Sequence, residues 1–212
     1  MRGKIIVQLV FTLFMAPFAW ANVEYRLSLT NLTRNQALSA PLIALHAPEF
    51  RMFTLGHPPS PGLAMLAEEG ARDLLKSEMS SATEDGFVYE GTVSIAPGKT
   101  RIYKFKVPSK DLVLSFATML VTTNDGFTGV SNLPLPAAEL YTDLYSYDAG
   151  SERNTESCDH IPGPPCGSHN VRVIDGAEGR VQIHPGIVGS GDLAPSQAGW
   201  SEPVVRIHLE KL

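Results

Sequence analysis

Hydrophobic and polar residues alternate in several short segments, with the period of two that is typical of half-buried β-strands. Tyr25, Leu27 and Leu29 alternate with polar neighbours and predict a first strand near the N-terminus. The segment 112–123, LVLSFATMLVTT, is almost continuously apolar, so we expect it in the centre of the molecule, covered on both faces. The same patterns predict further strands at 42–47, 87–95, 103–107, 171–174, 180–184 and 204–209.

One stretch has helical spacing instead. Ser60 followed by Pro61 reads as an N-cap with proline in the first turn. The apolar positions then recur every three or four residues and predict one helix over about 61–78: Leu63, Leu66, Ala67, Gly70 and Leu74. We expect Glu68 on the solvated face of this helix. Many short strands with one helix predict a mainly β fold, an antiparallel β-sandwich.

The N-terminal residues predict a cleavable signal peptide over 1–21. Two basic residues precede an apolar run at 5–18, and Ala-Trp-Ala supplies the small-x-small pattern for cleavage between Ala21 and Asn22. About 14 apolar residues are fewer than the roughly 20 that cross a bilayer. We therefore expect export to the periplasm or the medium, no transmembrane segment in the mature chain, and one domain over 22–212.

Charge narrows the possible partners. The formal net charge is −5, from 17 basic and 22 acidic residues. Removal of the two signal-peptide bases leaves 15 − 22 = −7. An acidic chain is not suited to nucleic acid, whose phosphates require a basic surface, but it suits divalent cations.

The two cysteines, Cys158 and Cys166, enclose a proline-rich loop. In an exported protein such a pair predicts a disulfide. The alternatives are free thiols, or a zinc site in which both cysteines join His160 and His169.

Acidic residues stand beside glycines in two turn-like segments, NDGFTG at 124–129 and YDAGSE at 147–152. If both segments lie at one end of a sandwich, Asp125, Asp148 and Glu152 bring three negative charges together, which calcium with its six to eight oxygen ligands would neutralise. Two alternatives remain open from the spacing: ordinary Asx turns, and paired carboxylates for glycoside hydrolysis that also include Glu156.

Several segments in order resemble the spondin N-terminal domain family, especially its bacterial single-domain members, and are related to the spondin domains of F-spondin and mindin. These segments span about residues 24–209: YRLSLTNLT, HAPEFRMFTLG, AEEG, ATMLVTTNDGFTG, YDAGSERN and HPGI. The resemblance implies a β-sandwich that holds calcium at one end. It places Asp125 at the first calcium aspartate of the family, and Asp148 and Glu152 at the two acids of its DAG loop, where animal members have aspartate at the second position.

These observations predict an exported, calcium-binding module of recognition or adhesion type that is not an enzyme. Its expected ligand is a cell-surface, glycan or matrix component. The alternative is a periplasmic metal-dependent hydrolase that uses the acids at 125, 148 and 152, or zinc in the Cys/His loop.

Overall fold

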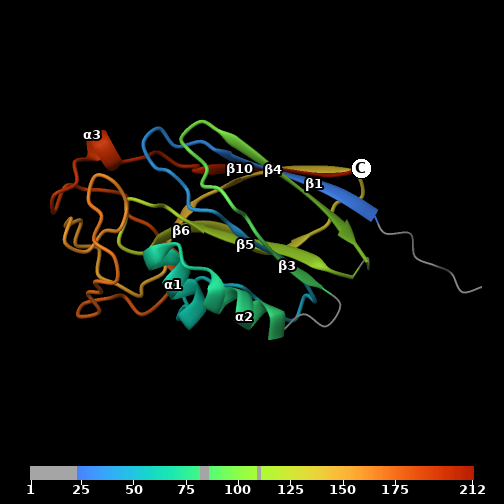
Figure 1. The fold of residues 1–212 in the computed structure, drawn as a ribbon, viewed down its shortest axis with the longest axis horizontal. Helices are drawn as coiled ribbons and strands as arrows, with labels where there is room; N and C mark the ends of the chain where they lie inside the picture. The colour runs from blue at the N-terminus through green and yellow to red at the C-terminus, as the bar shows by residue number, and fades with distance from the viewer. Residues whose placement is uncertain (1–22, 82–85, 109–110) are drawn as a thin grey trace, which may run out of the picture.

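The computed structural model describes residues 23–81, 86–108 and 111–212 and consists of two packed antiparallel sheets (Figure 1). The four-stranded sheet has the order β4 (Thr100–Val107), β1 (Val23–Asn31), β10 (Val205–Lys211) and β7 (Glu139–Leu144). The six-stranded sheet has the order β3 (Phe87–Glu90), β2 (Leu42–His46), β5 (Val113–Met119), β6 (Gly126–Pro134), β8 (Ser146–Asp148) and β9 (Gln182–Ile183). The predicted mainly β sandwich is confirmed.

The main core lies between the two sheets. The alternation predicted for β1 is confirmed, since Tyr25, Leu27 and Leu29 are buried and the residues between them are partly exposed. Leu27 lies opposite Leu209 on β10 and Tyr103 on β4, so three strands supply one layer of this core. Side chains of β2 and β5 complete it from the other sheet: Ile43, Leu45, Leu114 and Phe116.

Two helices cover the outer face of the six-stranded sheet (Figure 1). Leu63 and Leu75 from these helices pack with Leu42 and Ala117 in a second core cluster. Strands β2 and β5 are therefore buried on both faces, which is the physical reason for their continuous apolar sequence and confirms the central place predicted for 112–123.

The single helix predicted over 61–78 is wrong in extent, because the structure has α1 (Pro61–Glu69) and α2 (Asp73–Ser81). Gly70 ends α1 with φ at 69°, a left-handed conformation that glycine adopts without steric cost. Gly62 allows the two helices to pack closely, since a Cβ there would lie 2.5 Å from Leu75 Cα. A third helix, α3 (Pro195–Ala198), precedes β10 in the sequence.

Some strands differ from the prediction. Strands β6 and β7 were not predicted, and residues 171–174 form a loop rather than a strand. Val173 explains this difference, because its N–H donates to the Glu152 carboxylate at 3.1 Å and its carbonyl accepts from Arg153 N at 2.9 Å. The loop therefore has hydrogen-bond partners outside any sheet.

The long loops between β8 and β10, together with α3, gather at the end of the sandwich opposite the C-terminus (Figure 1). None of the helices in the described ranges is long and apolar enough to cross a bilayer. The predicted signal peptide, with cleavage between Ala21 and Asn22, lies outside the described residues.

Candidate metal centre

Asp125 occupies the tight turn between β5 and β6. Thr123 shapes this turn, since its hydroxyl donates to Leu120 O at 2.7 Å and accepts from Gly126 N at 2.9 Å. The Asp125 side chain is fully buried. Its Oδ2 accepts hydrogen bonds from Ser151 N at 2.8 Å and Glu152 N at 3.0 Å, whereas its Oδ1 has no hydrogen-bond partner in the described part of the chain.

Asp148 is the last residue of β8 and lies beside this turn. It is paired with Gly126 across the sheet, and the next residue, Ala149, donates from its N–H to Asp125 O at 3.1 Å. The Asp148 carboxylate is fully buried and accepts from Gly150 N at 2.6 Å and Asn154 Nδ2 at 2.5 Å. The strand pairing thus brings together the two acidic turns that the sequence places 23 residues apart.

Gly150 is required where the second acidic turn meets Arg180, shortly before β9. Its φ is 67°, and a Cβ would lie 2.3 Å from Arg180 O. Both the left-handed backbone and the close approach exclude a larger residue. The DAG segment can therefore fold back over Asp125 and direct its amides toward that carboxylate.

Burial sets the electrostatics of this pair. It is the main reason that the pKa of the Asp125 carboxyl lies well above its usual value, and the charge of Asp148 raises it further. Burial also raises the pKa of Asp148, with a smaller contribution from Glu178. Two adjacent buried carboxylates are costly when both are charged, and a bound cation would remove that cost.

Glu152, the third predicted ligand, contacts the site mainly through its backbone. Its N–H donates to Asp125, while its buried side chain accepts from Val173 N at 3.1 Å. Burial and the nearby charge of Glu68 raise the pKa of Glu152 to about 7. The Glu152 carboxylate is therefore directed toward Val173 and toward Glu68 on α1, while its amide contacts Asp125.

Glu68 is a member of this acidic region that the sequence reasoning missed. It was expected on a solvated helix face, but it is 2% exposed. Its Oε1 accepts from Arg172 Nη2 at 2.7 Å, and its Oε2 lies 2.6 Å from Arg172 Nε as an ion-pair contact without an aligned hydrogen bond. The hydrogen bond to Glu68 raises the pKa of Arg172, and the charges of Glu152 and Asp125 add to this shift.

The donor set suits a hard cation only if backbone and neutral oxygens contribute. Within the described ranges, no group of three His, Cys, Asp or Glu side chains is arranged to hold a metal ion. The two aspartates nevertheless offer oxygen ligands, and the buried Oδ1 of Asp125 is a carboxylate oxygen that lacks a partner. Calcium commonly completes its shell with carbonyl, amide and water oxygens, so the residues present fit this ion.

The predicted disulfide between Cys158 and Cys166 is confirmed. Both sulfurs are joined to each other, so they are not available for the alternative zinc site. The two histidines of that alternative have other partners: His160 Nδ1 lies 3.0 Å from Thr155 Oγ1, and His169 Nδ1 lies 2.9 Å from Glu69 Oε2.

Glu156, considered above as a possible catalytic carboxylate, is buried and bound by backbone amides of the protein itself. It is 3% exposed. Its oxygens accept from three consecutive backbone N–H groups, those of Val188 at 2.6 Å, Gly189 at 2.7 Å and Ser190 at 2.7 Å. The glycine-rich segment near residue 190 is therefore a binding loop for the protein's own carboxylate.

The fold and the site together define a class, a disulfide-containing β-sandwich with buried acids in the loops of one end. The Spondin_N family model matches residues 13–167, and the chain belongs to this family. A search of curated proteins gave no match. Spondin N-terminal domains are extracellular, non-enzymatic modules of recognition and adhesion type, and this membership and the disulfide are consistent with a secreted protein.

Proposed function

We propose that this protein is an exported recognition module in which calcium, held by the carboxylates of Asp125 and Asp148, orders the loops of one end of the sandwich, while the Glu152 amide positions Asp125. The observation that carries the proposal is the buried Asp125 Oδ1, which has no hydrogen-bond partner in the described ranges and belongs to a carboxylate beside Asp148. The ion would supply positive charge where two desolvated carboxylates repel each other. Its effect would be to hold the 124–126 and 148–154 segments in one fixed arrangement.

Burial favours a binding role for these acids over a catalytic one. Asp125 and Asp148 are fully buried, and Glu152 is 2% exposed. An acid that protonates or attacks a substrate must reach the reacting atoms. Carboxylates enclosed by their own loops serve an internal ion better than an external substrate, and the recognition surface is then the outer side of the ordered loops.

Direct measurement of calcium binding tests the proposal. Titration calorimetry of the chelator-treated protein should give one calcium per chain with a dissociation constant of about 0.1 to 1 mM, the range of extracellular modules. Asp148→Asn should abolish this binding. Asp159→Asn is the matched control, because it removes the same charge from an exposed side chain of the same loop region and should bind like the wild type.

Native mass spectrometry provides the second measurement. The wild type should carry one calcium, which chelation removes, while the two cysteines stay oxidised. Wild-type calcium affinity in Asp148→Asn would overturn the ligand assignment, and failure of the wild type to bind calcium would overturn the proposed function.

A further inference from the structure

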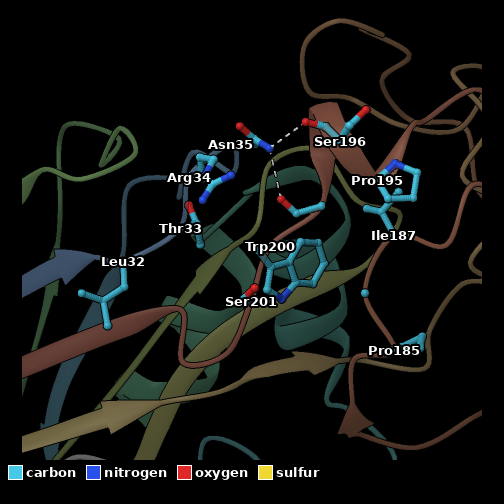
Figure 2. A pocket seen from close by; sticks show the side chains of 12 residues that line it. Leu32, Thr33, Arg34, Asn35, Pro185, Ile187, Pro195, Ser196, Trp200 and Ser201 are labelled. Atoms are coloured by element: carbon cyan, nitrogen blue, oxygen red, sulfur yellow. Dashed lines mark hydrogen bonds between the residues drawn. The ribbon is translucent and has the colours of Figure 1, made fainter.

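A cavity lies at the end of the sandwich that bears α3, and none of the acids described above line it (Figure 2). Its volume is about 420 Å³, which is sufficient for a small ligand. Three segments line it: Leu32 to Asn35 after β1, Pro185 to Ile187 after β9, and residues from Pro195 to Ser201 in and after α3.

The walls of this cavity are held by buried polar contacts. The Gln36 side chain is fully buried, donates to Ala198 O at 2.6 Å and accepts from Thr122 N at 3.0 Å. It thereby fastens α3 to the end of the six-stranded sheet. Asn35 Nδ2 lies 3.3 Å from both Ser196 O and Gly199 O and ties the rim of the cavity to the same helix (Figure 2). The cavity is therefore formed before any ligand arrives.

Trp200 provides a fixed aromatic surface in this cavity. Figure 2 shows its indole between the 33–35 loop and the 185–187 segment. The indole N–H donates to Ser146 Oγ and to Glu202 Oε1, both at 3.1 Å, and the His184 ring contacts it edge-on at a centroid distance of 5.0 Å. These contacts fix the orientation of the ring, which remains partly exposed.

Arg34 is the only ionisable residue among those that line the cavity. The side chain is exposed, and within the described ranges it makes no hydrogen bond or ion pair. In a chain with net charge −5, an arginine without an acidic partner beside a fixed indole is well suited to an anionic ligand. The hydroxyls of Ser196 and Ser201 line the same space, and in the described part of the chain they have no hydrogen-bond partner.

We infer that this cavity binds an acidic sugar, a single pyranose ring that bears a carboxylate. The Arg34 guanidinium pairs with the carboxylate, the indole of Trp200 packs against the apolar face of the ring, and the two serine hydroxyls bond to ring hydroxyls. This inference does not depend on the proposed calcium site, because the cavity is lined by other residues and its contacts require no ion.

Tryptophan fluorescence offers a local readout. Trp200 is the only tryptophan of the mature chain expected after signal-peptide cleavage, because the other tryptophan, Trp20, lies within residues 1–21. Titration of this protein with D-glucuronate should change its emission saturably, with a dissociation constant of about 1 mM for a ligand of this size. D-Glucuronamide has the same ring without the charge and should bind about tenfold more weakly.

Variants separate the charge from the fold. Arg34→Gln should weaken glucuronate binding about tenfold and leave glucuronamide binding unchanged. Lys106→Gln removes one positive charge from an exposed position on β4 and should bind like the wild type. Both titrations should give the same result with chelator present, whether or not the protein binds calcium.

Three results would overturn the inference: no saturable change in Trp200 emission at millimolar glucuronate, equal affinity of wild type and Arg34→Gln, or loss of binding on chelation. The last result would place the sugar at an ion rather than in this cavity.

Discussion

Replacement of Asp125 by asparagine separates the contribution of a bound ion from that of packing. The substitution keeps the size of the side chain and removes one charge. In the metal-free protein it relieves repulsion with Asp148, but it also weakens the hydrogen bonds from Ser151 and Glu152, and each effect is of order 1 to 3 kcal/mol. Because these effects oppose each other, we expect metal-free stability close to that of the wild type.

Calcium should then distinguish the two proteins. With a dissociation constant of about 0.1 to 1 mM, calcium at about 2 mM raises the free energy of unfolding by roughly 0.6 to 1.8 kcal/mol. For a domain of this size, 1 kcal/mol corresponds to about 2 to 4 °C in Tm, so the wild-type midpoint should rise by about 1 to 7 °C. The midpoint of Asp125→Asn should not change.

Differential scanning calorimetry with chelator and with calcium measures the metal-free stability and the calcium-dependent rise in Tm on the same samples. Asp159→Asn, which loses an exposed charge, should show the full wild-type rise. If Asp125→Asn also shows that rise, Asp125 is not a ligand and the reasoning from its unpartnered oxygen fails.

Two further predictions concern neighbouring buried groups. Arg172→Gln leaves Glu68 without its charge partner and should lower metal-free stability in urea by about 1 to 3 kcal/mol, with partial recovery in the double variant with Glu68→Gln. The same change should strengthen calcium binding, because a positive charge near the site is removed. Burial lowers the pKa of His184 from 6.5 to about 4, so the contribution of the neutral imidazole to stability is present above pH 6.5 and is lost as the pH falls toward 4. Between pH 6.5 and pH 4, the free energy of unfolding of His184→Gln should therefore fall by up to about 3 kcal/mol less than that of the wild type.

Two outcomes would contradict these predictions. Unchanged pH dependence in His184→Gln would contradict the assignment of that dependence to the buried imidazole. For Arg172→Gln, weaker calcium binding than in the wild type would show that Arg172 supports the site rather than competing with the ion.

The β-sandwich, and the proximity of the two acidic turns at one end of it, could be predicted from the sequence. The nearly continuous apolar segment 112–123, which contains β5, ends just before Asn124 and Asp125, and the turn residues around Asp148 mark a second strand end. Loops of a sandwich gather at its two ends, so the proximity of these acids follows from local patterns and one rule of architecture.

Contacts between distant segments were not predictable in this way. Glu68 has the local context of a solvated helix residue, and its charge partner Arg172 lies 104 positions later. Strand β7 was hidden by neighbouring prolines, and it lies at the edge of its sheet with alternating exposure. In both cases the contacting residues are distant in the sequence, so the local hydrophobic pattern does not predict the contact.

The position of Glu156 determines how much of the chain is needed for a stable domain. The family match ends at residue 167, yet the three amides that solvate this carboxylate belong to residues 188–190, and β10 lies between β1 and β7. A fragment cut at the end of the match would leave an enclosed negative charge unsolvated and would open the middle of a sheet. The segment after residue 167 is thus an integral part of the folding unit, and homologous domains should be delimited by their last strand rather than by where sequence similarity fades.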